Sequence, residues 1–194
     1  MKKSLLTTVT VLFMSFTLLM GQETKPNAVT LSYGVASTDE IMSIWGDVFG
    51  SIVGYSREEV KTSGVIILNY NRDVAKLWSI GGGLAYEQSA GNAYILGNKV
   101  GKDNRYYLTI ALEGRINYLK KPIFNLYSGL GLGYTIAKGT ITYDDKSPDT
   151  KQDFSHINYQ ITAVGFRVGK DLAGVAEVGF GYKGIANIGV SYRF

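Results

Sequence analysis

Hydrophobic and polar residues alternate along most of the chain, from residue 27 to the last residue. In residues 106–118, for example, Leu108 and Ile110 alternate with Thr109 and Ala111. Side chains of a β-strand point alternately to its two faces, so such a segment has one apolar face and one polar face. The pattern recurs in residues 29–36, 62–72, 77–88, 106–118, 124–136, 156–168, 174–182 and 185–194. The sequence therefore predicts eight strands, most of them near the roughly 9 to 11 residues that cross an outer membrane.

The connections between these segments alternate in length. Those at residues 72–76, 120–123 and 170–173 are short, whereas those after the first, third and fifth segments are long. Short turns at one end and long loops at the other are typical of outer-membrane barrels, and an even strand number returns both termini to the short-turn, periplasmic end. We therefore expect an all-β fold, an eight-stranded antiparallel up-and-down transmembrane β-barrel. Near Thr162 and Ala163 the alternation changes phase, which predicts a β-bulge.

The polar face of the strands carries charges of both signs. Alternation alone does not separate a membrane barrel from a soluble sandwich, but aromatic residues lie near the ends of the apolar bands, as interface girdles do. The predicted lumen charge network consists of Glu87, Glu113, Arg115, Arg167, Glu177 and Arg193. Eight strands enclose only enough space for side chains, and buried charges must pair or be hydrated. We expect a polar, plugged interior, and the alternative is a narrow channel for ions or small solutes.

The first long connection has a helical pattern. Its apolar residues recur at helical spacing and would form one face: Ile41, Ile44, Trp45, Val48, Phe49 and Ile52. Ser37 followed by Glu40 is a capping-box pattern that could begin the helix. We expect one short amphipathic helix in the first extracellular loop. It could form a lid over the barrel mouth or pack against other loops, lie in the outer-leaflet interface, or dock a partner; its acidic residues disfavour the interface.

The N-terminus has the layout of a secretory signal. Lys2 and Lys3 precede a nearly uncharged stretch that ends at the small residue Gly21. Residues 1–21 are therefore expected to be a cleaved signal peptide, which leaves residues 22–194 as one outer-membrane β-barrel domain. The alternative is a retained membrane-anchor helix.

Composition narrows the class of protein. The 194 residues include 24 glycines and 14 tyrosines but 3 prolines, a balance that favours a closed β-structure. Cysteine is absent from the sequence, which excludes disulfides, thiolate metal sites and a lipoprotein anchor. The net charge of +4 falls to +2 once Lys2 and Lys3 are subtracted, too little to indicate a nucleic-acid partner.

The exported chain, the eight amphipathic segments, the alternating connections and the ending Tyr192-Arg193-Phe194 resemble small outer-membrane β-barrel proteins of the OmpA/OmpX-like group, a porin-family-like domain. The resemblance covers nearly all of the mature chain but includes no diagnostic motif. It implies a monomer in the outer membrane of a Gram-negative bacterium, surrounded by outer-membrane lipid and lipopolysaccharide. It also implies a C-terminal signal for the barrel-assembly machinery, which here would be Ile188, Val190, Tyr192 and Phe194.

Some barrels of this size are lipid A-modifying enzymes, so candidate catalytic residues matter. The single histidine, His156, follows Ser155, but adjacent strand residues point to opposite faces and cannot form a nucleophile–base pair. The aspartates of residues 144–153 lack the spacing of an EF-hand loop. We expect no catalytic residues, metal site or cofactor, and a structural or surface-interaction role with an extracellular ligand or protein at the loops. The alternatives are the narrow channel, a lipid A-modifying enzyme and a soluble exported lipocalin-like binder.

Overall fold

The computed structural model describes residues 25–194 except Val53 and Lys146, and leaves the side chains of Val48 and Ser51 undescribed. The predicted signal peptide, residues 1–21, lies outside the described residues. The elements are β1 (Asn27–Val35), α2 (Thr38–Ile52), β2 (Tyr55–Asp73), β3 (Trp78–Ile95), β4 (Asn98–Lys120), β5 (Phe124–Tyr143), β6 (Thr150–Gly169), β7 (Leu172–Gly181) and β8 (Ala186–Arg193).

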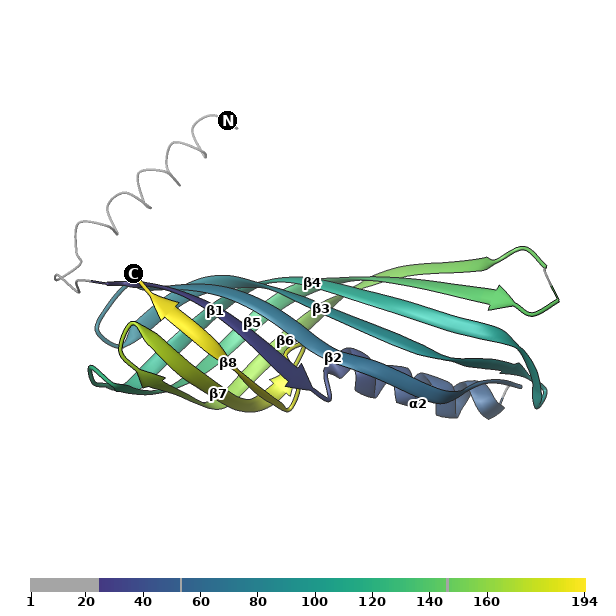
Figure 1. Ribbon diagram of the computed structural model, residues 1–194, viewed down its shortest axis with the longest axis horizontal. Helices are drawn as coiled ribbons and strands as arrows, with labels where there is room; N and C mark the ends of the chain where they lie inside the picture. The colour runs from purple at the N-terminus through teal and green to yellow at the C-terminus, as the bar shows by residue number, and fades with distance from the viewer. Residues whose placement is uncertain (1–24, 53, 146) are drawn as a thin grey trace, which may run out of the picture.

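The strands pair in chain order, each antiparallel to the next, and β8 pairs with β1 to close the barrel (Figure 1). This confirms the predicted fold, that of the OmpA/OmpX-like barrels that the sequence resembles. The register of β6 skips Ala163 against both of its neighbours, which confirms the predicted bulge. Asn27 and Phe194 form two backbone hydrogen bonds with each other. The first residue of β1 and the last residue of the chain therefore lie at the same end of the barrel, which we call the base.

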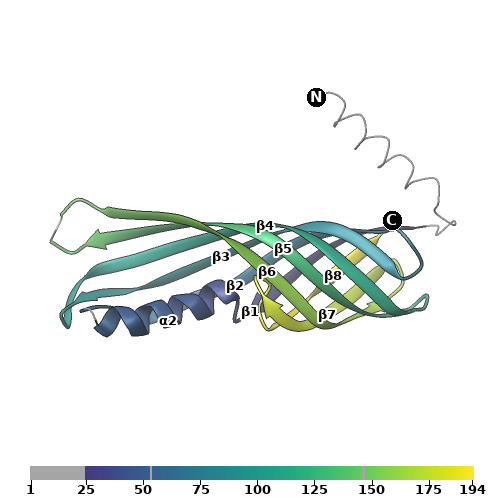
Figure 2. The ribbon, with the colours of Figure 1, turned by 180° about the vertical axis from the view of Figure 1, so that it is seen from behind.

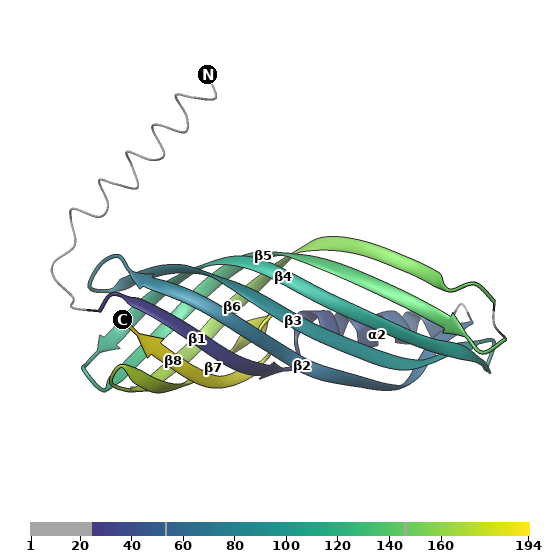
Figure 3. The ribbon, with the colours of Figure 1, turned by 45° about the horizontal axis from the view of Figure 1, so that its top comes forward.

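The barrel wall is much taller on one side than on the other. β1, β7 and β8 have 9, 10 and 8 residues, whereas β2 to β6 have between 18 and 23. The tall strands continue as a curved sheet past the ends of the short ones (Figures 1 and 3). We call this extension, residues 55–64, 88–106, 138–143 and 150–159, together with α2, the platform.

The platform differs from the long loops expected after the third and fifth segments. Residues 88–106 form a hairpin whose strands meet at the tight turn of Leu96 and Gly97, both with positive φ, of 49° and 79°. Several outward residues of this hairpin, such as Gln88, Asn92 and Lys102, are polar, so the apolar half of the strand pattern is interrupted there. A strand that is polar on its outer face is therefore easily mistaken for a loop.

Below the platform the barrel is apolar outside and polar inside. On β4, Leu108, Ile110 and Leu112 are 41%, 54% and 77% exposed, whereas the intervening Thr109 and Ala111, and Glu113 after them, are buried. A water-soluble protein would bury the first set and expose the second, so this is the distribution of a transmembrane barrel. Among the described residues, no helix is both long enough and apolar enough to cross a membrane.

Helix α2 confirms the helix predicted for the first long connection. The Ser37 hydroxyl accepts a hydrogen bond from the backbone N–H of Glu40 at 3.0 Å, and the Glu40 carboxylate accepts one from the N–H of Ala36 at 3.1 Å, so the predicted cap is present. The helix runs lengthwise beside β2 on the open side of the tall wall and does not lie across the barrel mouth (Figures 1 and 2).

The apolar face of α2 points away from the barrel. Ile44, Trp45, Phe49 and Ile52 are between 53% and 77% exposed, Ile41 is half-buried, and the side chain of Val48 lies outside the described residues. The polar residues Asp39 and Ser43 are buried on the opposite side. The helix therefore follows the rule of the strands, polar inside and apolar outside, because the inner face of the platform is lined with charged groups.

Candidate functional site

The centre of the lumen is filled from the side by the turn between β7 and β8. Tyr182 and Lys183 in this turn are each 1% exposed, although they follow directly on the short wall of the barrel. The backbone N–H of Tyr182 donates to the carbonyl of Tyr159 at 3.0 Å, and that of Ile185 donates to the carbonyl of Val35 at 2.9 Å. We call residues 182–185 the plug turn, because both of its ends are fixed to the wall and its side chains enter the lumen.

Lys183 and Tyr182 meet two carboxylates in the lumen. Lys183 Nζ lies 2.8 Å from Glu113 Oε2 and 3.4 Å from Glu177 Oε2. The Tyr182 hydroxyl donates to Glu113 Oε1 at 2.6 Å, and the Asn69 amide donates to the same oxygen at 2.8 Å. Both oxygens of the Glu113 carboxylate thus have hydrogen-bond or ion-pair partners, which come from the plug turn and from the tall wall.

Arg115 completes this central cluster. One terminal nitrogen of its guanidinium lies 3.3 Å from Glu113 and 3.3 Å from Glu177, and the group lies over the ring of Tyr127 at 4.9 Å. The Tyr127 hydroxyl donates to Glu177 at 2.7 Å. Two cations therefore face two anions, and all four side chains are well shielded from solvent. A buried network with matched charges and satisfied hydrogen bonds holds its members in one geometry.

Of the six lumen residues predicted from the sequence, the structure brings three together, Glu113, Arg115 and Glu177. Their fourth partner, Lys183, was missed, because a lysine in a connection between strands is normally solvated. One sequence feature could have indicated that Lys183 is buried, namely that β7 and β8 are short. Short strands place the turn between them below the top of the taller wall. Of the other three predicted residues, Glu87 faces the upper part of the lumen, and Arg167 and Arg193 face the base.

Glu87 lies at the upper end of the lumen, where α2 begins. Its side chain is 3% exposed and accepts a hydrogen bond from the Ser37 hydroxyl. Nearby, His156 Nε2 lies 3.0 Å from Asp39 Oδ1, which ties the first turn of α2 to β6. The Ser155 hydroxyl instead bonds that of Tyr134 on the outer surface at 2.6 Å, so Ser155 and His156 do point to opposite faces, as predicted.

A second charged cluster attaches α2 to the platform. Arg57, whose side chain is fully buried, donates to Ser43 of α2 at 2.8 Å and to Ser89 at 3.0 Å, and lies 3.3 Å from Asp103 and 3.6 Å from Asp47. The buried inner face of the platform thus holds the polar side of the helix.

This shielding raises the pKa of two groups beside Arg57 and Asp103. Burial raises the pKa of Tyr55 to about 12, and the hydrogen bond that its hydroxyl donates to Asp103, at 2.8 Å, adds to the effect. Burial likewise raises the pKa of Asp47, against the opposing attraction of Arg57.

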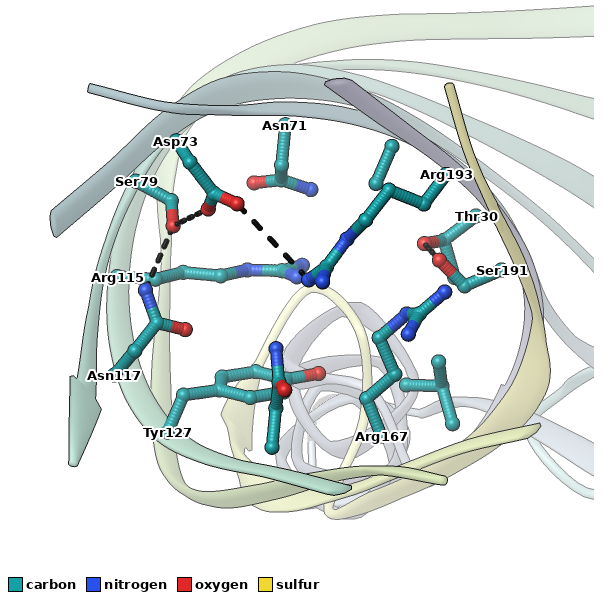
Figure 4. Close-up of a pocket in the computed structure, with 13 residues that line it drawn as sticks. Thr30, Asn71, Asp73, Ser79, Arg115, Asn117, Tyr127, Arg167, Ser191 and Arg193 are labelled. Carbon is teal, nitrogen blue, oxygen red and sulfur yellow. Dashed lines mark hydrogen bonds and ion pairs between the residues drawn. The ribbon is translucent and has the colours of Figure 1, made fainter. Parts of the chain in front are cut away.

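Arg167 and Arg193 lie at the base of the barrel, around a small pocket (Figure 4). Arg193 lies 4.0 Å from Asp73, a residue that also accepts a hydrogen bond from Ser79 at 2.6 Å and pairs with Lys120 at 2.9 Å. Arg167 donates to the backbone carbonyls of the turn at residues 169–171. Within the described part of the chain, no three acidic or histidine side chains are grouped so as to hold a metal ion.

The residues of the predicted assembly signal lie on the outer face of β8. Ile188, Val190, Tyr192 and Phe194 are between 48% and 67% exposed. This row faces outward in the folded barrel, and its recognition by the barrel-assembly machinery stays a prediction.

Comparison with known proteins gives similarity of fold alone. No protein-family model and no curated protein matches the sequence. Among solved structures, the chain is similar to Ail, the attachment invasion locus protein of Yersinia pestis, solved in complex with the heparin analogue sucrose octasulfate. The two chains share 14% identity over 87% of this chain and 99% of Ail, with a TM-score of 0.49. The N-terminal β-barrel domain of Pseudomonas aeruginosa OprF shares 13% identity over 88% of this chain and 99% of that domain, with a TM-score of 0.38. Likeness at this level says nothing of what this chain binds, so its function has to be inferred from its own residues.

Proposed function

We propose that this protein is a non-enzymatic integral outer-membrane barrel that does not conduct and that holds the platform on the cell surface for contact with an extracellular ligand or protein. The observation that carries the proposal is the combination of an apolar outer band, a filled lumen and a sheet that extends past the band on one side only. The first two features concern anchoring, and the third concerns the surface role.

The apolar band supports membrane insertion. Large apolar residues are exposed on the outer face of every strand, and tyrosines such as Tyr33, Tyr86 and Tyr106 lie along the upper border of the band, where amphipathic rings prefer the interface. Above that border the outward positions become polar, as at Lys102 and Lys138. Water is therefore the expected surroundings of the platform.

The central cluster argues against a pore. A conducting lumen needs a hydrated path, whereas Glu113, Glu177, Arg115 and Lys183 pair with one another across the lumen and are shielded from solvent. The narrow channel expected as the alternative would require the plug turn to leave its place.

The platform supports a surface role, because its size exceeds what the anchor requires. Strands of 8 to 10 residues already close the barrel on one side, so the additional residues of β2 to β6 do nothing for crossing the membrane. The long hairpins continue the strands of the wall, and α2 is held to them by Arg57, which suits a surface that binds something outside the cell.

Labelling of single cysteines on intact cells tests the proposal, because the chain contains no cysteine of its own. Asn98→Cys places a thiol at the tip of the platform, and Lys121→Cys places one in a turn at the base. In a Gram-negative host, a maleimide reagent that cannot cross the outer membrane should label the first variant. It should label the second only after the cells are opened.

Equal labelling of both variants, or recovery of the protein in the soluble periplasmic fraction, would refute the anchored topology. Steady single-channel currents from the refolded protein in planar bilayers would refute the closed lumen and favour the channel alternative. Binding of cells that carry the protein to host matrix or to other cells, compared with cells whose platform is truncated, tests the surface role separately.

A further inference from the structure

Four large apolar side chains form an exposed row along α2, called the α2 row. Met42, Trp45, Phe49 and Ile52 are between 59% and 77% exposed, and the rings of Trp45 and Phe49 stack with their centroids 6.3 Å apart. Successive members are three, four and three residues apart, which is the a and d spacing of a heptad. A row with this spacing stays on one side of a helix and is the usual seam between two paired helices.

Gly46, beside this row, is not required by the fold of the chain. It lies four residues after Met42 and three before Phe49, so it neighbours both on the surface of the helix. Glycine inside a helix is unfavourable relative to alanine, and a Cβ at this position would meet no neighbouring atom within 4 Å. A glycine on an exposed apolar face permits another backbone to approach closely. Its presence therefore favours a helical partner packed against the α2 row.

The charges of α2 leave the exposed side of the helix neutral. The helix contains no basic residue, and its acidic groups are held on the side of the barrel. Asp39 lies 3.0 Å from His156, and Asp47 lies 3.6 Å from Arg57. The carboxylate of Glu40 belongs to the helix cap. Two copies of this face would therefore meet without repulsion between like charges.

The membrane determines how two copies would meet. α2 runs along the long axis of the barrel, so it lies close to the membrane normal once the barrel is inserted (Figure 2). A two-fold axis along that normal relates two barrels of the same membrane and places their α2 helices side by side and parallel. Both barrels lie at the same depth, because their apolar bands are the same. Equal residues of the two rows would therefore lie at equal heights, as a parallel heptad seam requires.

The exposed area of the row suits association within a membrane. At about 200 Å² for a large side chain, the row presents roughly 500 Å² per copy. Two copies would bury about 1,000 Å², the lower end of specific interfaces, and sharing one membrane raises the effective concentration of the second copy. We propose that two copies of this chain associate through α2, as a parallel helix pair whose seam is the α2 row and whose closest approach is at Gly46.

This dimer differs from the monomer that the resemblance to OmpA/OmpX-like barrels implies, and it rests on the anchored topology proposed above. Disulfide cross-linking in intact cells tests it, because the chain has no cysteine of its own. Met42→Cys places a thiol in the seam, where the two equivalent Cα atoms should lie within the roughly 7 Å that a disulfide spans. Mild oxidation should convert most of this variant to a dimer. Lys138→Cys, on the outer face of β5, should stay monomeric.

A second variant separates close packing from general stickiness. Gly46→Leu makes the helix easier to form and adds apolar surface, so it would strengthen a non-specific association. It should instead abolish the dimer, because the new side chain fills the place of the second backbone. Lys102→Leu adds the same side chain at an exposed position of the platform and should leave the dimer intact. Sedimentation of the refolded proteins in detergent measures the dimer fraction, and the heat-modifiable gel band shows that each barrel is folded.

A Met42→Cys adduct with the mass of a different protein would overturn the proposal and assign the α2 row to another partner. No adduct at all would overturn it in favour of lipid, and equal cross-linking of both cysteine variants would show only random collision. An undiminished dimer in Gly46→Leu would reject the close approach of the two helices. External labelling of Asn98→Cys tests the anchored topology by itself, so a missing dimer in cells that label normally rejects the dimer alone.

Discussion

Lys183 is the residue on which the charge balance of the lumen depends. Lys183→Met would leave Glu113 and Glu177 with Arg115 as their one cation. Because an uncompensated buried charge costs roughly 3 to 5 kcal/mol, we expect the free energy of unfolding to fall by about that amount. Urea unfolding in detergent measures it, and Lys99→Met, at an exposed position of the platform, is the matched control.

The double variant Lys183→Met, Glu177→Gln restores one cation to one carboxylate. It should recover part of the lost stability, because the two positions are 3.4 Å apart and therefore couple. Additive losses at the two positions would show that Lys183 acts through packing and not through its charge.

Gly34 on β1 permits the close approach of the plug turn. A Cβ at this position would lie 2.0 Å from the backbone oxygen of Lys183, which cannot yield without moving the turn. Gly34→Ala should therefore destabilise the protein by roughly 1 to 3 kcal/mol, the usual cost of overpacking. Gly114→Ala is the control, since a Cβ there would meet no atom within 4 Å. The temperature at which the folded gel band disappears should fall for the first variant alone, and an equal fall in both would contradict this role of Gly34.

At the scale of elements, α2 depends on Arg57 for its position. Arg57→Met removes the contacts to Ser43 and Asp47 and leaves Asp103 with less compensation, a loss of roughly 3 kcal/mol or more. The loss is local, so we expect α2 to detach while the barrel persists. Chymotrypsin should then cleave at the helix about 100-fold faster, the factor equivalent to about 3 kcal/mol.

Lys61→Met, which removes an exposed charge from the same strand, should leave the cleavage rate unchanged. If the rate in Arg57→Met stayed at the level of the unmodified protein, the attachment of α2 would have to depend on other contacts, such as the pair of Asp39 with His156.

The elements also show how far the sequence alone could go. Period-two alternation predicted all eight strands and the bulge of β6, and helical spacing with the Ser37 cap predicted α2, because both signals are local. The outward direction of the apolar face of α2 was not predictable, since it depends on Arg57 and Asp103, which become neighbours only in the folded sheet. Lys183 was missed for the same reason, because its carboxylate partners come from β4 and β7.

For the whole molecule, the position of the membrane follows from the two tryptophans. Trp78 lies on the outer face of β3 near the base, level with the apolar band, whereas Trp45 lies on α2, which begins beyond the last residue of β1. The upper platform is polar at outward positions such as Lys102 and Lys138, so the lipid should end below Trp45. The helix would then stand above the membrane with its apolar face available to a partner.

Single-tryptophan variants in vesicles of brominated lipid measure this directly. Fluorescence of Trp45→Phe, which reports on Trp78, should be strongly quenched by the bromine atoms, and that of Trp78→Phe, which reports on Trp45, should be quenched instead by aqueous iodide. The prediction depends on α2 running parallel to the long axis of the barrel, beside β2, as Figure 2 shows. If bromine quenched both tryptophans equally, the outer leaflet would have to cover α2, and its apolar face would be a lipid contact and not a site for a partner.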